Sequence, residues 1–380
     1  MSICLCMIVK NESKMIETTL AHLCERIPFA YWVISDTGST DHTRELIRAF
    51  FQNRIPGELV EHEWRDFAYN RTKALECAYQ KTDYVMVFDA DDAIVGTLTL
   101  PPLKEDRYMA TFGTTESYLR PLLLTNRKIW TYKGVLHEYV DAPEIRTTGM
   151  LTGNYYIHSG RTGARNQNKQ KYQEDALLLE KAYQTELDES LKDRYAFYCA
   201  QSHMDAKQVN PAVEWYHTCL QRNGWTQEKY YASLQLGKLY AFQKKKEQAM
   251  EVWRNSVLYD PERIEGLVMA AIYAQLHGDH ALVNALYHRC KGYKRPSRKL
   301  FLQNQLYEYE IEYLNSKSAY FVKDFESGYQ CCKTIILYHR NKERMVHGIR
   351  TLKLYQEQLK RDVEFTTLLK TKMPESWMQF

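Results

Sequence analysis

The first 89 residues alternate short apolar runs with amphipathic segments, and this alternation constrains the fold more than any other feature. The apolar runs predict strands at 2–9, 31–36, 59–64 and 84–89. The segments between them have helical spacing and cover 13–25, 41–52 and 67–80. Strands that alternate with helices favour βαβ units and a mostly parallel sheet, and continuously apolar strands favour cover on both faces. We therefore expect an α/β domain with a Rossmann-like, doubly wound layer.

Beyond residue 105 the runs become shorter, and YMATFG, YLRPLLLT and NYYIH predict short, antiparallel strands. From about residue 166 the sequence is helical and contains an internal repeat. One unit carries small and aromatic residues at the offsets of a tetratricopeptide repeat (TPR), namely Leu236, Gly237, Tyr240, Ala249, Trp253 and Pro261. Further units precede and follow it, with a weaker one at 320–338. We expect an α/β domain over 1–165 and an all-α, TPR-like domain over 166–380.

Composition excludes several classes of protein. A formal net charge of +4 over 380 residues does not favour a nucleic-acid partner. The nine cysteines are odd in number and include no CxxC pair, which fits a reduced intracellular protein better than a disulfide scaffold or a zinc site. The apolar start ICLCMIV is too short for a membrane span and lacks a basic leader. We expect a cytoplasmic protein without a transmembrane segment, and a peripheral membrane contact stays open.

The stretch VMVFDADD places three carboxylates, Asp89, Asp91 and Asp92, directly after a buried strand. Like charges this close repel, so some of them should be costly to keep ionised. In an extended chain Asp89 and Asp91 point the same way, and together they suit a hard divalent cation, Mg²⁺ or Mn²⁺. The structural alternative is a polar turn that caps the next segment. The role of Asp92 stays open.

Two other strand ends carry polar groups. The first predicted strand ends in Lys10, Asn11 and Glu12, and the second ends in SDTGSTD, which begins at Ser35 and includes Asp36. Ligands of open parallel sheets bind beyond the carboxyl ends of the strands. These ends would therefore converge on one rim, where a nucleotide base, ribose and diphosphate would find successive contacts.

Four blocks carry a family resemblance: CLCMIVKNESKMIETTL, VISDTGSTDHT, FAYNRTKALECA and VMVFDADD. In their order and spacing they resemble family 2 glycosyltransferases of the GT-A fold. The resemblance covers roughly residues 1–165, and similar proteins with a TPR tail extend it loosely over the chain. It implies transfer of a sugar from a nucleotide-sugar donor, by default a UDP-sugar, usually with inversion. The acceptor would be a hydroxyl on a glycan or a protein, and Mn²⁺ or Mg²⁺ the cofactor.

The resemblance also implies roles for individual residues. Those placed at the nucleotide sugar are Asn11, Glu12, Asp36, Asn70, Arg71 and Asp89. Those placed at the metal are Asp91, Asp89 and the late histidine His158. For Arg71 the alternative is a solvated helix residue, and for His158 it is a structural histidine.

On the acceptor side, Glu138 in GVLHEYV stands where GT-A enzymes carry an acidic motif, which makes it the candidate general base. His137 is the candidate that orients Glu138 or the acceptor. A Glu138 ion pair with a nearby Arg or Lys is the alternative. Arg161 and Arg165 follow His158 in a basic loop that would close over the diphosphate, unless they are solvated charges.

Two other functions compete with glycosyl transfer. A nucleotidyltransferase can share the fold and the acidic site, but it usually carries a Gly-rich basic loop after the first strand, which KNES is not. The third reading is a non-catalytic TPR scaffold with a vestigial GT-A domain. Helical repeats commonly bind extended peptides or proteins, so the second domain is expected to bind the acceptor, another protein or a second copy.

Overall fold

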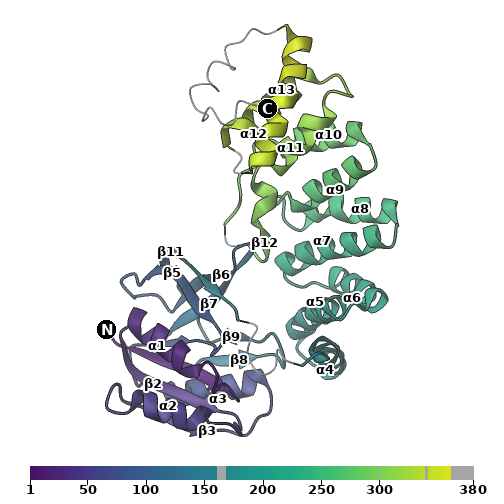
Figure 1. Cartoon of the computed structure of the whole chain (residues 1–380). Helices are drawn as coiled ribbons and strands as arrows, with labels where there is room; N and C mark the ends of the chain where they lie inside the picture. Colours follow the sequence, from purple (N-terminus) through teal and green to yellow (C-terminus); the bar gives the residue numbers. More distant parts are fainter. Residues whose placement is uncertain (161–167, 298, 339–340, 361–380) are drawn as a thin grey trace. The chain divides into compact units, whose positions relative to one another are not determined.

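The computed structural model describes residues 1–160, 168–297, 299–338 and 341–360 (Figure 1). By internal contacts, this part of the chain divides into two compact units. The first comprises the described residues of 1–232 with residues 299–302, and the second comprises Ser233–Ser297 with the described residues from Gln303 onward. The division into domains after residue 165 stays a prediction, and the first compact unit also includes the helices that follow that point.

The first unit begins with the expected βαβ pattern. Its parallel strands are β1 (Ile3–Val9), β2 (Phe29–Asp36), β3 (Gly57–Glu61) and β4 (Tyr84–Val87). The helices between them are α1 (Ile16–Arg26), α2 (Thr43–Phe51) and α3 (Phe67–Ala78). The spatial order β3-β2-β1-β4 puts β1 in the middle, where it pairs in parallel with β2 and β4. This order confirms the Rossmann-like α/β layer.

Later strands extend the same sheet in the order β4-β7-β6-β11-β5. They are β5 (Ala93–Thr99), β6 (Arg107–Phe112), β7 (Glu116–Thr125), β10 (Thr148–Met150) and β11 (Thr152–His158). The pairs β4–β7, β6–β7 and β11–β5 are antiparallel, as the shorter runs predicted, whereas β10 pairs with β6 in parallel. A separate hairpin consists of β8 (Thr131–Lys133) and β9 (Tyr139–Asp141).

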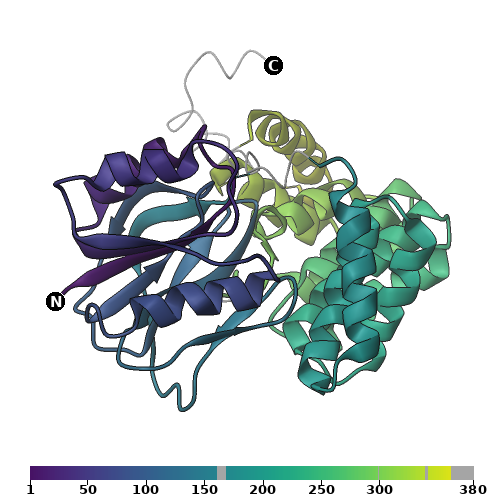
Figure 2. The same ribbon diagram turned by 90° about the horizontal axis from the view of Figure 1, so that it is seen from below.

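Alternate residues of β1 serve two separate cores. Ile3, Leu5 and Met7 pack in a cluster that includes residues of α1 and α2. Cys4 and Cys6 face the opposite cluster, which includes residues of α3 and of the β8–β9 hairpin. Successive side chains of a strand point to opposite faces, so a central strand that is apolar throughout needs cover on both. Figure 2 shows the helices on the two faces of the sheet.

Strand β3 departs from the expectation of cover on both faces. It covers Gly57–Glu61 rather than 59–64, and its residues are partly or fully exposed. The strand lies at the edge of the sheet, where it has a neighbour on one side only. The glutamates before and after its Leu-Val pair are compatible with that exposure, since charged side chains protect sheet edges from unwanted pairing.

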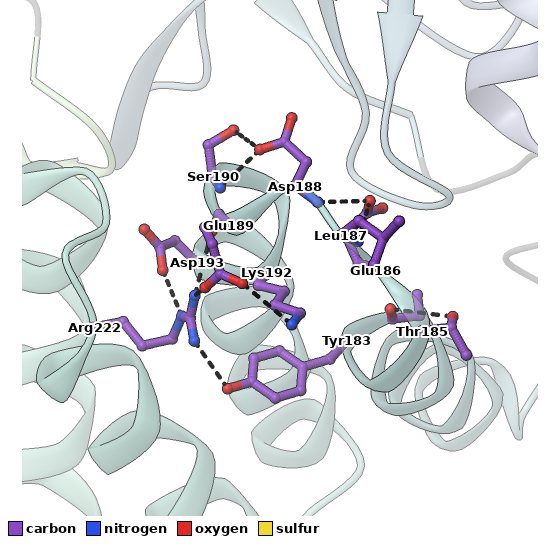
Figure 3. Close-up of polar contacts among 11 residues, drawn as sticks. Tyr183, Thr185, Glu186, Leu187, Asp188, Glu189, Ser190, Lys192, Asp193 and Arg222 are labelled. Carbon is purple, nitrogen blue, oxygen red and sulfur yellow. Dashed lines mark hydrogen bonds and ion pairs between the residues drawn. The ribbon is translucent and has the colours of Figure 1, made fainter.

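The first unit continues into helices α4 (Lys171–Thr185), α5 (Glu189–Asp205) and α6 (Val209–Gln221), followed by the start of α7 (Thr226–Phe242). Arg222, at the end of α6, ties three helices together (Figure 3). Its guanidinium donates to Asp193 at 2.5 Å and to Glu189 at 2.6 Å, both on α5, and to the Tyr183 hydroxyl of α4 at 3.2 Å. These hydrogen bonds hold α4, α5 and α6 together.

The second unit is helical. It contains α8 (Lys246–Asn255), η2 (Ser256–Leu258), α9 (Glu265–Leu276), α10 (His280–Cys290), η3 (Asn304–Tyr307), α11 (Glu310–Ser318), α12 (Phe325–Tyr338) and α13 (Lys342–Leu359). Along the chain, one boundary between the two units falls within the short strand β12 (Leu302–Gln303). Successive helices pack against each other, which confirms the TPR-like architecture.

Small residues bring paired helices of this unit close together, as the repeat pattern predicted. A Cβ on Gly237 would lie 2.2 Å from the Trp253 Nε1 atom, and Trp253 donates a hydrogen bond to the Leu234 carbonyl at 3.1 Å. Between α12 and α13, a Cβ on Gly328 would lie 2.1 Å from the Tyr355 ring. An aromatic side chain thus fills the seam that the glycine opens. All nine cysteines are free thiols.

Within the described ranges, the structure contains no helix with the length and apolar character needed to span a membrane.

Candidate active site

A pocket of about 520 Å³ opens at the carboxyl ends of β1, β2 and β4. Its wall includes Asn11 and Glu12 after β1, Thr37 after β2, and Asp89 and Asp91 after β4. The structure therefore brings together the strand ends that the sequence singled out. Their position is the usual one for ligands of an open α/β sheet.

The loops after β1 and β2 are bonded to each other. The Asn11 amide oxygen accepts a hydrogen bond from the Thr40 N–H at 2.8 Å, and the Asn11 N–H donates to the Ser39 hydroxyl at 2.9 Å. The Glu12 N–H donates to the Thr43 hydroxyl at 2.8 Å. Asn11 has a positive φ of 57°, which asparagine tolerates better than most residues. Asn11 therefore shapes the rim, and Glu12 lines the pocket.

The two carboxylate oxygens of Asp36 differ in their hydrogen bonding. One carboxylate oxygen accepts from the backbone N–H groups of Gly38 and Ser39, at 3.0 and 2.9 Å. The other oxygen is buried without a hydrogen-bond partner among the described residues, and Asp36 is only 1% exposed. Buried polar atoms normally have a partner, so the orphaned oxygen is a candidate acceptor for a ligand donor.

The acidic stretch after β4 is a turn rather than an extended strand. β4 ends at Val87, and the Asp92 N–H donates to the Asp89 carbonyl at 3.2 Å. The expectation that the strand runs to Asp89 is therefore wrong, although Asp89 and Asp91 both line the pocket. Because the chain turns here, the three carboxylates have separate surroundings.

Asp89 lies between two guanidinium groups. Arg71 Nη2 donates to one carboxylate oxygen at 2.6 Å, and Arg120 Nη1 donates to the other at 3.1 Å. Burial alone would raise the pKa of Asp89, but the two arginines outweigh burial and hold it well below its usual range. Both oxygens of Asp89 are thus engaged by arginines, which does not favour the predicted direct contact with a metal.

Arg71 connects Asp89 to Glu138. Its Nε donates to Glu138 Oε1 at 2.7 Å, and the side chains of Arg71 and Glu138 are 7% and 10% exposed. Arg71 lines the pocket, and its Nη1 atom is buried without a partner among the described residues. Glu138 therefore has an arginine partner, which was the alternative to a role as the base, and the same bond places it beside the pocket.

Asp92 is the carboxylate that carries the electrostatic cost foreseen from the sequence. It is 7% exposed, and burial together with the nearby charge of Asp89 raises its pKa to about 7. Asp91, in contrast, lines the pocket. In the acidic turn, Asp89 and Asp91 thus line the pocket, Asp89 is also bound by two arginines, and Asp92 is buried.

His158 lies beside this turn. It is the last residue of β11, and it pairs with Ala93 at the start of β5, directly after Asp92. Gly160, two residues after His158, packs against the acidic turn: a Cβ on it would lie 1.8 Å from the Asp91 carbonyl oxygen. The predicted loop residues Arg161 and Arg165 lie outside the described residues.

Asn70 bonds to the loop that forms one wall of the pocket. It is fully buried, its amide oxygen accepts from the Arg65 N–H at 3.0 Å, and its amide nitrogen donates to the Glu63 carbonyl at 3.0 Å. These bonds hold the loop that carries Trp64, a pocket residue. Asn70 therefore positions the wall, and its predicted direct contact with a nucleotide stays a prediction.

Residues 4–119 match the glycosyl transferase family 2 model. This match confirms the family resemblance over the part of the chain that contains the strand ends, Arg71 and the acidic turn. The matched segment is thus similar to a glycosyl transferase family 2 domain. The search of curated proteins gave no match.

Solved structures resemble the chain only distantly. The crystal structure of MamA is 11% identical over 48% of this chain and 93% of that chain, with a TM-score of 0.35. S. aureus TarS 1-349 is 16% identical over 79% of this chain and 96% of that chain, with a TM-score of 0.30. TTC0263, a thermophilic TPR protein in Thermus thermophilus, is 15% identical over 48% of this chain and 91% of that chain, with a TM-score of 0.29.

Several site residues were not found from the sequence. Arg120 lies inside the apolar run YLRPLLLT, where a lone arginine signals a buried ion pair. Trp64 and Phe67 line the pocket as an edge-to-face pair with ring centroids 4.9 Å apart. Lys171 at the start of α4 also reaches the pocket wall. Lys171 is far in sequence from the strand ends, so its place at the pocket could not be predicted from the local pattern.

A second group of possible metal ligands lies between α4 and α5, where Glu180, Cys199 and His203 offer ligand atoms within 4.8 Å of one another. The two ring nitrogens of His203 already bond to Gln208 at 2.6 Å and to Glu180 at 2.9 Å. Burial raises the pKa of the Cys199 thiol, which disfavours the thiolate that a metal requires. The group is therefore best read as a hydrogen-bonded network of the helical core.

Proposed function

We propose that the chain is a metal-dependent, inverting glycosyltransferase that moves a sugar from a nucleotide-sugar donor, by default a UDP-sugar, to a hydroxyl of a glycan or protein. The observation that carries the proposal is the bridge formed by Arg71. One buried guanidinium joins the acidic turn at Asp89, the pocket wall and Glu138. The groups that we propose for donor binding and for proton transfer would thereby meet at one end of the sheet.

The donor half would use the strand-end loops. The orphaned Asp36 oxygen would accept a donor N–H or hydroxyl, and the aromatic wall at Trp64 would pack against a flat ring. Arg71, whose Nη1 atom has no protein partner among the described residues, would donate to a phosphate or to the sugar. Lys171 adds a positive charge to the pocket wall.

The residues fit a divalent cation at the acidic turn. Asp91 supplies a carboxylate on the pocket wall, and His158 supplies an imidazole at the neighbouring strand end. This mixed oxygen and nitrogen set suits Mn²⁺. When bound, the cation would stabilise the negative charge that develops on the departing diphosphate. We place Asp91 and His158 in the ligand set and leave Asp89 to the arginines.

The chemical step would proceed by direct displacement. Glu138 takes the proton from the acceptor hydroxyl, whose oxygen forms a bond to the anomeric carbon from the face opposite the leaving group. The bond from that carbon to the phosphate oxygen breaks, and its electron pair leaves with the nucleoside diphosphate. Arg71 fixes the direction of the Glu138 carboxylate through Oε1 and lies at the donor side of the same pocket.

Release of nucleoside diphosphate from a panel of nucleotide sugars with Mn²⁺ tests the proposal. We expect Asp91→Ala to abolish release and to weaken Mn²⁺-dependent UDP binding. Glu138→Gln should abolish release but leave UDP binding nearly intact. Glu144→Gln, an exposed glutamate in the loop after β9, is the matched control and should behave as wild type.

Other outcomes would replace this function. Release of pyrophosphate instead of nucleoside diphosphate would identify a nucleotidyltransferase. No UDP binding and no release with any donor would leave a non-catalytic scaffold with a vestigial domain. Normal turnover by Glu138→Gln would remove Glu138 as the base and leave the donor site intact.

A further inference from the structure

The turn that carries Glu138 has a strained backbone. It comprises residues 134–138 and joins β8 to β9. His137 has a φ of 54°, in the left-handed region that non-glycine residues rarely adopt. Such a conformation persists only where the surroundings enforce it, and it directs the residue that follows. The residue that follows is Glu138.

Helix α5 supplies the surroundings that enforce this turn. The Val135 N–H donates to the Tyr195 hydroxyl at 3.2 Å. The His137 carbonyl accepts from Arg194 Nε at 2.8 Å. The His137 ring stacks on Tyr198, with centroids 3.9 Å apart and planes 10° from parallel. Two backbone groups and one ring of the turn are therefore held by a single helical face.

The face of α5 is itself held firmly. Arg194 Nη1 donates to Glu228 of α7 at 2.7 Å, and these side chains are only 20% and 4% exposed. Arg222 ties the start of α5 to α4 and α6, as Figure 3 shows. Because α5 is braced on both sides, it can impose a conformation on the turn instead of yielding to it.

We propose that Arg194, Tyr195 and Tyr198 are positioning residues for Glu138, so that helix α5 forms part of the acceptor side of the active site. The inference rests on the proposed function of Glu138 as the base. Glu138 is held from two directions: Arg71 fixes its carboxylate, and α5 fixes the backbone on its N-terminal side. The helical region thus has a role in the chemical step, separate from any binding of a partner.

A pair of variants at Tyr198 isolates the ring stack. Tyr198→Phe keeps the ring over His137, whereas Tyr198→Leu removes it. With UDP-hexoses, Mn²⁺ and water as acceptor, Tyr198→Leu should lower kcat for UDP release by at least about tenfold, because small misplacements of a reacting group are costly. The KM for the donor should change by less than about twofold. Tyr198→Phe should retain nearly full activity.

Amide hydrogen exchange gives a second readout that does not need turnover. Residues 135–138 should exchange about tenfold faster in Tyr198→Leu, while amides of β1 and α1 should keep their protection. Tyr195→Phe keeps the ring but removes the acceptor of the Val135 N–H, and it should speed exchange at Val135 alone.

The outcomes separate the two proposals. If wild type releases UDP and Tyr198→Leu matches it in kcat and in exchange at 135–138, the positioning role is refuted. Equal loss of kcat in Tyr198→Phe and Tyr198→Leu would also refute it, because the ring would then not be the cause. If wild type releases no UDP from any donor, the proposed function fails, and the exchange data alone decide whether α5 orders the turn.

Discussion

The bridge at Arg71 permits a quantitative prediction. Replacing Arg71 by methionine keeps much of the side-chain volume but removes the cation that Asp89 and Glu138 share at 2.6 and 2.7 Å. The side chains of Arg71, Asp89 and Glu138 are largely buried, at 7%, 20% and 10% exposure, so water replaces the lost partner only in part. Breaking a buried ion pair by removing one partner typically costs about 3–5 kcal/mol.

The loss should come mainly from Glu138. Asp89 retains Arg120 at 3.1 Å after the substitution, whereas Glu138 forms its ion pair with Arg71. We therefore expect Arg71→Met to lower the free energy of unfolding by about 3–5 kcal/mol. For a domain of this size, that corresponds to a fall of about 6–20 °C in the unfolding midpoint.

The double variant Arg71→Met with Glu138→Gln tests the reasoning. Because it also removes the unpaired charge, it should recover roughly half of the lost stability. Urea unfolding followed by tryptophan fluorescence measures both variants. Lys73→Met, at a partly exposed position of α3, is the control; it removes only the Lys73–Glu76 pair at 2.6 Å, and because surface ion pairs contribute little, its urea midpoint should be close to that of wild type. A loss below about 1 kcal/mol in Arg71→Met, or no recovery in the double variant, would show that the bridge is not a stabilising element.

Three further predictions concern other parts of the chain. Gly237→Ala should destabilise the helical unit by about 1–3 kcal/mol, because its Cβ would meet the Trp253 ring at 2.2 Å; calorimetry measures this, and an unchanged midpoint would contradict the packing. Burial lowers the pKa of His347 to about 4, below its unfolded value of about 6.5, so stability should fall by about 1–2 kcal/mol as pH drops between these values, after discounting for partial exposure. His347→Gln should remove that part of the pH dependence of the urea midpoint. Asp36→Ala should cost about 1–2 kcal/mol in urea unfolding, since the N–H groups of Gly38 and Ser39 lose their acceptor, whereas Asp36→Asn should cost less.

The arrangement of β1 to β4 could be predicted because it follows from hydrophobic pattern and chain order alone. Continuous apolar runs mark buried strands, and helices between them require parallel pairing. The same logic correctly placed the ends of β1, β2 and β4 around one pocket. The prediction of cover on both faces failed at β3. The glutamates within this run indicate an exposed edge strand, which its apolar residues alone did not reveal.

The charges of the site could not be assigned from the local pattern. Alternation along an extended chain put Asp89 and Asp91 on one side, and both do line the pocket, but the pattern did not show that two arginines bind Asp89. Which carboxylate is paired depends on Arg71 and Arg120, which approach from a helix and from a distant strand. Such pairings are properties of the tertiary fold, so a sequence can name the acidic residues without saying which of them faces the ligand.

The contact between α5 and the 134–138 turn has a consequence for exchanging parts between related chains. A hybrid that joins residues 1–165 to foreign repeats would replace Arg194, Tyr195 and Tyr198, and with them the support beneath Glu138. A hybrid joined after Ala232 would keep the complete support, since that is where the first compact unit divides from the second. The transplantable unit of this chain therefore ends within α7, and repeats beyond that point are free to diverge in whatever they bind.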